Sequence, residues 1–368
     1  MGVIEEIDGR VLERVVRRAL GDGSLSVSRG VSEQLAGGTV AGVFRLRGTA
    51  WKDGAAPVPW SCVLKILHEW ERDGDPQCWS REARFYPSGV YDCLPAGLTV
   101  PRCYELEEKG GEYRLWLEDV AGRRGLELSA ADYGVAARGL GRFQGQYMAG
   151  RPLPDFDWLA GLNWRRETTG DMGPYAIGRI RNGELDGSAT HLRLKGMLSA
   201  LDGLWARRDD LSREVESLPR TLAHRDFHAD NIFARENGGG TPETVLIDWD
   251  CAGVGVVGED IGDVVAEAMV YFRYSPRQAE VLLANVLGEY AAGLADAGWR
   301  GSPDLALRGV INNWSVHWCF RIARGVIHAP DPRDREGLVE RLDWMLSRIQ
   351  RGAELQPGKA PPRRSGRG

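Results

Sequence analysis

The pattern of hydrophobic residues changes near residue 119 of this 368-residue chain, and this change constrains the fold more than any other feature. Before it, short apolar or alternating runs separated by Gly and Pro are typical of β-strands. After it, Leu and Ala recur at helical spacing. The expected strands are 26–36, 42–47, 61–67, 100–106 and 113–117, and the expected helices are 1–20, 76–86, 129–148 and 191–205 with further helices over 278–350. A strand-rich first third followed by a mostly helical remainder predicts an α+β fold with two lobes.

Charge and cysteine usage exclude several classes of protein. The 47 Lys and Arg residues against 52 Asp and Glu residues give a formal charge of -5, whereas nucleic-acid-binding proteins are normally basic. The six cysteines form no C-x-x-C pair and no metal-ligand spacing, which indicates reduced thiols. The first twenty residues do not resemble a secretion signal, and no run of about 20 apolar residues is present to cross a membrane. We therefore expect a cytoplasmic protein with neither nucleic acid nor membrane as a partner.

The strongest chemical signal is a polar segment followed by an apolar strand that ends in an acid. Phosphoryl transfer from a nucleotide needs a carboxylate to orient the attacking hydroxyl, and oxygen ligands to hold Mg²⁺ on the phosphates. Asp226 matches the carboxylate of a kinase catalytic loop, and Asn231 and Asp248 match its metal ligands. The two parts read His224-Arg225-Asp226-Phe227-His228-Ala229-Asp230-Asn231-Ile232 and Val245-Leu246-Ile247-Asp248-Trp249-Asp250. Their order and spacing predict a phosphotransferase that uses Mg²⁺.

These motifs, with Gly255 and Gly258-Glu259-Asp260-Ile261 downstream, resemble the aminoglycoside phosphotransferase family, whose members phosphorylate hydroxyls of small molecules. The resemblance implies a bilobal protein-kinase-like fold. Residues 1–118 are then a nucleotide-binding lobe with an antiparallel β-sheet and a helix, and residues 119–356 are a larger, mostly helical lobe for catalysis and acceptor binding. Residues 357–368 hold three prolines, four basic residues and no acid, which predicts a disordered basic tail.

The resemblance also implies nucleotide contacts in the first lobe. Lys65 lies inside an apolar strand, where a buried ammonium needs a partner. It would contact the α and β phosphates and be held by Glu82. The alternatives are a lysine on an edge strand that faces solvent, and a surface pair of Glu82 with Arg81 or Arg84.

Two further segments are expected to touch the nucleotide. Gly37, Gly38 and Thr39 lie where a hairpin would cover the phosphates, because glycines let backbone N–H groups approach them. Glu118 and Val120 lie in the segment that would link the lobes and pair with the adenine edge through its backbone. An ordinary tight hairpin and a plain strand end are the alternatives.

Other acids and histidines of the motif are expected to support the catalytic loop. In the family, the residue at His224 pins the loop, since Asp226 already supplies a proton acceptor. An acid then braces the loop through its backbone, and both Asp260 and Asp263 are candidates for this role. Asp250 either lies beside the metal ligands or is solvated.

The acceptor pocket is expected between residues 155–215 and the helices near 312–320. Residues 151–260 hold nineteen acids against thirteen Lys and Arg residues, a balance that would attract a cationic acceptor such as an aminoglycoside. His228 and Asp230 either pack the loop or face this acceptor. Five tryptophans could stack on a ring or belong to the core: Trp158, Trp164, Trp205, Trp314 and Trp318.

The sequence thus predicts an enzyme that moves the γ-phosphate of ATP or GTP to a hydroxyl of a small molecule, such as an antibiotic or another natural product. Two alternatives stay open: a kinase of the same fold that acts on peptide Ser or Thr side chains, and a pseudokinase that binds nucleotide and serves as a scaffold.

Overall fold

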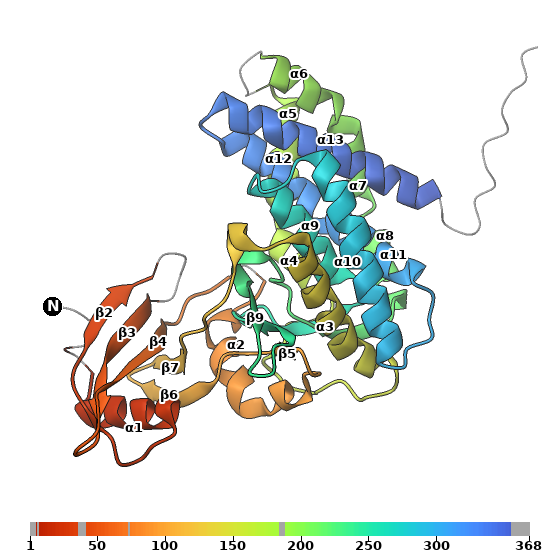
Figure 1. The fold of residues 1–368 in the computed structure, drawn as a ribbon. Coiled ribbons are helices and arrows are strands. Elements are labelled where there is room, and N and C mark those ends of the chain that lie inside the picture. The colour runs from red at the N-terminus through yellow and green to blue at the C-terminus, as the bar shows by residue number, and fades with distance from the viewer. Residues whose placement is uncertain (1–4, 6, 36–41, 73, 184–187, 355–368) are drawn as a thin grey trace, which may run out of the picture.

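The computed structural model describes residues 5, 7–35, 42–72, 74–183 and 188–354. Gly37, Gly38 and Thr39, and the predicted tail 357–368, lie outside these described residues. Figure 1 shows a curled sheet with helix α1 (Gly9–Leu20) on one side of the molecule and a larger helical body on the other. The predicted α+β class with an N-terminal antiparallel sheet is confirmed.

The strands form three sheets. The first sheet has the order β1-β3-β4-β7-β6, with β2 also paired to β3, and all its pairings are antiparallel. The second has the order β5-β10-β9, and the third pairs β11 with β8. The strands are β1 Ser26–Val27, β2 Val31–Gln34, β3 Gly42–Trp51, β4 Val58–Leu67, β5 Leu98–Thr99, β6 Cys103–Lys109, β7 Glu112–Glu118, β8 Arg220–Ala223, β9 Ile232–Glu236, β10 Pro242–Leu246 and β11 Gly253–Val256.

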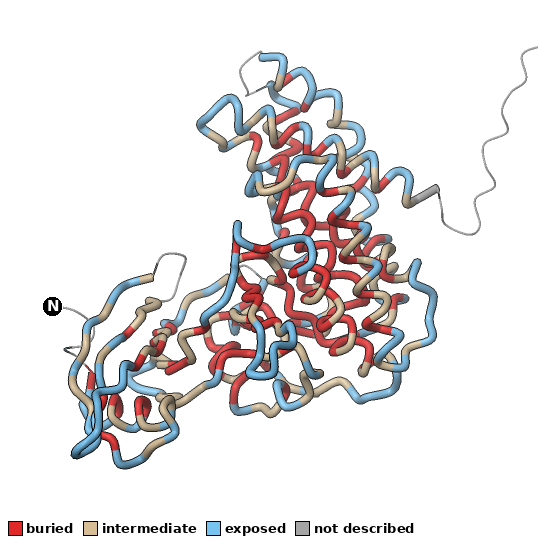
Figure 2. Tube along the Cα trace, in the orientation of Figure 1, coloured by how far each residue is buried: buried red, intermediate tan, exposed pale blue. Residues whose placement is uncertain are grey.

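The helical body surrounds one core. Figure 2 shows buried chain concentrated inside this body, whereas the first sheet is largely intermediate or exposed along its outer strands. The helices beyond α1 are α2 Cys78–Phe85, α3 Ala130–Met148, α4 Trp164–Thr169, α5 Met172–Arg181, α6 Ala189–Gly196, α7 Leu198–Ala206, α8 Arg208–Ser217, α9 Glu259–Val270, α10 Pro276–Asp296, α11 Asp304–Asn313, the π-helix η6 Trp314–Trp318, α12 Cys319–His328 and α13 Pro332–Glu354. No helix of the described chain is both long and apolar enough to span a bilayer.

Several sequence-based element boundaries were wrong: the expected strand 42–47 runs to Trp51, the expected strand 61–67 begins at Val58, and the expected helix 191–205 is two helices. Three further boundaries differ for a clear physical reason. The expected strand 26–36 is two strands, because Gly30 passes so close to β3 that a Cβ there would lie 1.6 Å from the Arg47 carbonyl oxygen. The expected strand 100–106 begins at Cys103, since Pro101 offers no N–H to a sheet ladder. The first helix begins at Gly9, where the Asp8 carboxylate accepts a hydrogen bond from the Arg10 amide at 2.8 Å.

Strand β4 divides its residues between two environments. Its residues Cys62 and Leu64 pack with α1 in one apolar cluster. The alternate residue Val63 packs against the large core of the helical body, because successive side chains of a strand point to opposite faces. Lys65 follows the parity of Val63. The alternation therefore places the Lys65 ammonium on the face of the sheet away from α1.

Helices α3 and α10 approach each other through glycines. A Cβ on Gly141 would lie 2.3 Å from the Tyr290 carbonyl oxygen, and one on Gly293 would lie 2.2 Å from the Arg138 carbonyl oxygen. Backbone atoms of the partner helix occupy the space that a side chain would need. Each helix begins with a capping box, at Ser129 and Ser275, so the ends of the pair are fixed locally.

This packing predicts opposite effects for two glycines of α10. Gly293→Ala should lower the free energy of unfolding by about 1 to 3 kcal/mol, because the added methyl group meets backbone. Gly288→Ala should raise it by up to about 1 kcal/mol, because no heavy atom lies within 4 Å of the new Cβ and Ala is the better helix former. Urea unfolding of both variants measures the difference. Equal effects would contradict the close α3–α10 packing.

Candidate active site

The catalytic loop predicted from sequence connects β8 to β9 and includes His224–Asn231. Its second residue, Arg225, has a φ of 65°, a left-handed conformation that is strained for any residue except glycine. The strain is held by Asp260 at the start of α9. The Asp260 carboxylate accepts the Arg225 amide at 2.6 Å and the His224 amide at 3.0 Å.

Asp260 is fully buried. Burial raises the pKa of its carboxyl group to about 6, even though the two backbone amides favour the charged form. Of the two acids considered from sequence, Asp260 contacts the backbone of the loop. The Asp263 carboxylate instead accepts hydrogen bonds from Asn313 and Trp318, both at 2.8 Å, and pairs with Arg165.

His224 joins the loop to the strand before Asp248. Its Nδ1 accepts a hydrogen bond from the Asp226 amide at 3.2 Å, and its Nε2 lies 2.9 Å from the Ile247 carbonyl oxygen. These contacts require the neutral imidazole with the proton on Nε2. Burial lowers the pKa of His224 to about 4, which keeps that form at neutral pH. The side chain thus has a structural position between the two parts of the motif.

Asp226 is an accessible acid of the loop, with 38% of its side chain exposed. Its Oδ2 accepts a hydrogen bond from Asn231 Nδ2 at 2.7 Å and lies 3.3 Å from His228 Nε2. Burial alone would raise the pKa of Asp226, but His228, His224 and Asn231 outweigh burial and hold it well below its ordinary value. A carboxylate with so low a pKa is a weak base. Such a group can orient and polarise a hydroxyl by accepting a hydrogen bond from it.

His228 and Asp230 form a charged cluster beside Asp226. Burial lowers the pKa of His228, but the hydrogen bond and charge of Asp226 and the charge of Glu267 raise it to about 9. Asp230 is 46% exposed on its side chain and pairs with Arg273 at 2.5 Å. Thus His228 packs within the loop, while Asp230 also faces solvent.

Asp248 follows β10 with a φ of 64°, again left-handed. Its Oδ1 accepts a hydrogen bond from Lys65 Nζ at 2.8 Å. Burial and the charge of Asp248 together raise the pKa of nearby Asp250 to about 7, and Arg72, at 3.1 Å, only partly offsets this. The carboxyl groups of Asp248 and Asp250 therefore repel each other when both are charged.

Lys65 forms an ion pair with Glu82 of α2 as well as with Asp248. Only 13% of the Lys65 side chain and 2% of the Glu82 side chain are exposed. Burial lowers the pKa of Lys65, but Asp248 and Glu82 overcome it and raise the pKa above its ordinary value. The charged lysine therefore links the sheet, α2 and the strand end that bears Asp248.

Glu118 and Val120, which were predicted to lie in the segment that links the lobes, contact different parts of the protein. The Glu118 carboxylate accepts hydrogen bonds from Arg235 at 2.6 Å and from the Arg102 amide at 3.2 Å. Val120 packs with Phe233 and Val245 in a small apolar cluster at the junction of sheet and helical body.

Four of the five tryptophans considered for stacking on an acceptor are buried in the structure and so belong to its packed interior: Trp158, Trp164, Trp314 and Trp318. The fifth, Trp205, packs edge-on against Phe320.

Sequence reasoning missed several charged residues around the loop. Except for Glu259, which lies in the Gly258-Glu259-Asp260-Ile261 segment but was given no role, these residues belong to no recognisable motif, so only the fold reveals their proximity to the loop. They are Arg72, Arg165, Glu259, Glu267 and Arg273.

The geometry is that of a phosphotransferase with a kinase-like fold. A model of the phosphotransferase enzyme family matches residues 81–299, more than half of the chain, so the chain belongs to this family. The sequence resemblance and the predicted enzyme class are confirmed. No curated protein matches the chain in sequence comparison.

Three solved structures share the fold. Choline kinase from Cryptosporidium parvum Iowa II is 11% identical, with 94% of this chain and 96% of that chain covered and a TM-score of 0.51. The GDP complex of wild-type aminoglycoside 2'-phosphotransferase-IIIa is 13% identical, with coverage of 94% and 99% and a TM-score of 0.50. The gentamicin–APH(2")-IIa complex is 13% identical, with coverage of 93% and 98% and a TM-score of 0.50. At these identities the likeness shows the fold alone.

The buried His224 predicts a pH effect on stability. Between about pH 6.5 and pH 4 the unfolded chain binds a proton at this residue and the folded chain does not, so acid lowers stability in this window. The stability advantage of the parent over His224→Gln should shrink by about 2 to 3 kcal/mol from pH 7.5 to pH 4.5. Urea unfolding at the two pH values measures it. His68→Gln removes an exposed imidazole, and an equal narrowing in that control would contradict the assignment.

Proposed function

We propose that this enzyme transfers the γ-phosphate of ATP or GTP to a hydroxyl group of a small-molecule acceptor. One observation carries the proposal: Lys65, Glu82, Asp226, Asn231 and Asp248, which span 184 residues of sequence, form two adjoining clusters of charge-assisted contacts, and His224 links them. Phosphoryl transfer depends chiefly on positioning and charge stabilisation, and this set supplies both. Residues 1–118 act as the nucleotide lobe and 119–356 as the catalytic and acceptor lobe in this proposal.

The donor set fits Mg²⁺. Asn231 uses its amide nitrogen on Asp226, which leaves the amide oxygen as a ligand, and Asp248 adds carboxylate oxygens. Hard oxygen ligands are those that Mg²⁺ prefers. The raised pKa of Asp250, caused by burial and by Asp248, marks repulsion that a divalent cation would relieve. When bound, Mg²⁺ would neutralise phosphate charge.

The protein's own residues account for the remaining steps. Lys65, held by Glu82, would neutralise the α and β phosphates once it exchanges Asp248 for the nucleotide. Asp226 would accept a hydrogen bond from the acceptor hydroxyl and align its oxygen with the γ-phosphate. The apolar cluster around Val120 would form part of the surface beneath the purine base, and the backbone near Glu118 would pair with its edge.

The acceptor class follows from charge. The carboxylates of Asp226 and Asp230 are both solvent-accessible, on either side of His228, and Arg273 neutralises Asp230 only in part. A hydroxylated acceptor that also carries amino groups, such as an aminoglycoside, fits this surface. The structural relatives named for gentamicin and choline support a small acceptor on this fold.

Asp226→Asn tests the proposed role of the loop carboxylate. The variant should bind nucleotide as the parent does, because Asn231 and Asp248 are unchanged, but transfer to the acceptor should fall by about a hundredfold or more. The measurement is phosphate incorporation from ATP and GTP into pools of aminoglycosides, other hydroxylated amines and peptides, with nucleotide affinity determined separately. Asp53→Asn, in the exposed β3–β4 turn, is the matched control.

Three results would contradict this proposal. Unchanged transfer in Asp226→Asn would assign the role to another group. Incorporation only into peptides would favour the peptide kinase. Nucleotide binding without transfer to any pool, together with a cellular phenotype that survives Asp226→Asn, would favour the scaffold.

Asp248→Ala tests the metal. In the parent, adding Mg²⁺ in the presence of ATP or GTP should raise the unfolding temperature further than nucleotide alone, because metal and nucleotide bind the folded state together. In the variant the increment from Mg²⁺ should vanish and turnover should be lost. Thermal unfolding with and without a chelator measures the increment. Full turnover of Asp248→Ala, or of the parent without divalent cations, would remove the assignment.

A further inference from the structure

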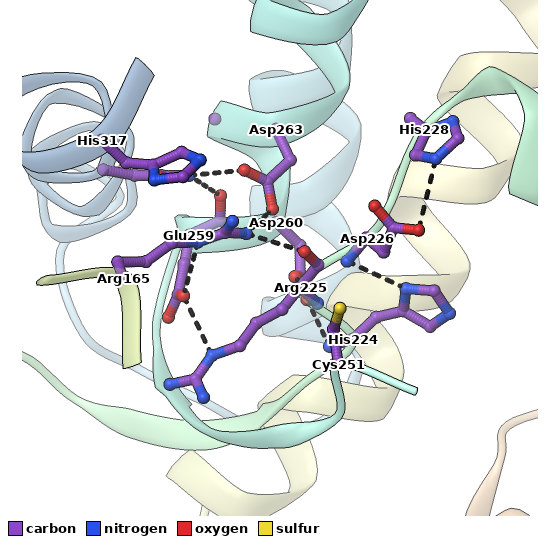
Figure 3. A network of polar contacts seen from close by, with 12 residues as sticks. Arg165, His224, Arg225, Asp226, His228, Cys251, Glu259, Asp260, Asp263 and His317 are labelled. Carbon is purple, nitrogen blue, oxygen red and sulfur yellow. Dashed lines mark hydrogen bonds and ion pairs between the residues drawn. The ribbon is translucent and has the colours of Figure 1, made fainter. Parts of the chain in front are cut away.

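Helix α4 places a buried cation directly beneath the catalytic loop. Arg165 is 8% exposed and belongs to none of the predicted nucleotide, metal or acceptor contacts. Its guanidinium donates to the Arg225 carbonyl oxygen at 2.8 Å, to Glu259 Oε1 at 3.2 Å, and to the Asp263 carboxylate. Figure 3 shows Arg165 and Arg225 close to the acids Glu259, Asp260 and Asp263 of α9, with Asp226 next to this group.

Arg165 and Asp260 hold the same strained residue from two sides. The Arg225 amide donates to Asp260, and the Arg225 carbonyl, one bond before the Asp226 amide, accepts from Arg165. The left-handed φ of 65° at Arg225 fixes the direction in which the next residue leaves the backbone. Such strain persists only where surrounding contacts over-determine the conformation. The orientation of Asp226 therefore depends on both contacts.

The side chain of Arg225 is tied to the same cation. Arg225 Nε donates to Glu259 Oε1 at 3.0 Å, so one carboxylate oxygen serves both guanidinium groups. The two guanidinium carbons also lie over one ring, that of Trp164, at 4.8 Å for Arg165 and 5.4 Å for Arg225. A shared carboxylate and a shared aromatic face hold like charges close together in a buried site.

We propose that Arg165 is a positioning residue that fixes the Arg225–Asp226 peptide and thereby aims the loop carboxylate at the acceptor. The proposal rests on the phosphotransferase function stated above. Asp260 of α9 holds the Arg225 amide, whereas Arg165 holds the Arg225 carbonyl oxygen. Arg165 belongs to α4, within residues 155–215, where the sequence predicted part of the acceptor pocket.

The same helix continues the connection to the nucleotide anchor. Trp164 Nε1 donates to Asp75 at 2.7 Å, and Asp75 pairs with Arg81 through both carboxylate oxygens, at 2.6 and 2.9 Å. Arg81 directly precedes Glu82, the partner of Lys65. Helix α4 thus contacts both the catalytic loop and the network that holds α2, so the two halves of the site share one buried support.

The test uses a variant that removes a buried charge pair as a unit. Arg165→Met alone would leave Asp263 buried without its cation and could fail to fold. In Arg165→Met/Asp263→Asn, the asparagine oxygen still accepts from Trp318, and Glu259 keeps Arg225. Arg166→Met is the matched control, because the next residue on α4 pairs with Asp209 at the surface.

Two readouts separate positioning from stability. In the double variant, kcat for phosphate transfer should fall tenfold or more while the nucleotide Kd stays within twofold. Hydrogen exchange at the Arg225 and Asp226 amides should accelerate tenfold or more while the unfolding temperature stays near that of the parent. Arg166→Met should leave all four quantities unchanged.

Unchanged amide exchange in the double variant would overturn the proposal, whether or not kcat falls. If that variant does not fold, Arg165→Lys is measured in the same way. It keeps one cation but cannot make all three contacts, so unaltered exchange there would also overturn the proposal. A parent that transfers phosphate to no acceptor would instead refute the proposed function, and the exchange experiment would still decide the role of Arg165.

Discussion

The active-site geometry depends on one buried carboxylate. Asp260 accepts two consecutive backbone amides of the catalytic loop and also a hydrogen bond from Gln144 of α3 at 2.6 Å. A buried acid is unfavourable unless its lone pairs are satisfied, and these donors satisfy it. Asp260 belongs to α9, and Gln144 belongs to α3, which packs on α10 through glycines. The loop conformation therefore depends on contacts with two helices of the helical body.

Ion pairs between distant segments arrange the rest of the candidate site. Two buried acids with a raised pKa pair with a cation from a distant segment: Asp250 with Arg72 and Asp263 with Arg165. Ion pairs of this kind contribute little net stability, because desolvation offsets attraction. Their value lies in geometry, since each one joins two segments that are far apart along the chain.

The sequence predicted the α+β fold class and the enzyme family, but not the contacts that join distant segments around the candidate site. The spacing of Asp226, Asn231 and Asp248 matches that of a kinase catalytic loop and its metal ligands. Lys65 is recognisable because it is a lysine inside an apolar strand. Arg165 has no such signal, because it is one of 42 arginines. Its partners Arg225, Glu259 and Asp263 are distant in sequence and come close to it only in the folded chain. The boundary of the expected strand 26–36 failed because Gly30 packs against the distant strand β3, whereas those at Pro101 and Asp8 failed for local reasons. The stacking role considered for Trp164 failed because its ring covers two buried guanidinium groups instead.

The pairing of Lys65 with Asp248 bears directly on nucleotide binding. A buried ammonium without a partner would be desolvated without compensation, and Glu82 and Asp248 are the partners of Lys65. In the proposed reaction, phosphate oxygens replace Asp248 at Lys65, and a divalent cation replaces Lys65 at Asp248. Every charge keeps an opposite partner before and after this exchange. In this proposal, nucleotide binding would redistribute existing ion pairs and would not bury new, unpaired charge, because Glu82 would keep Lys65 as its partner throughout.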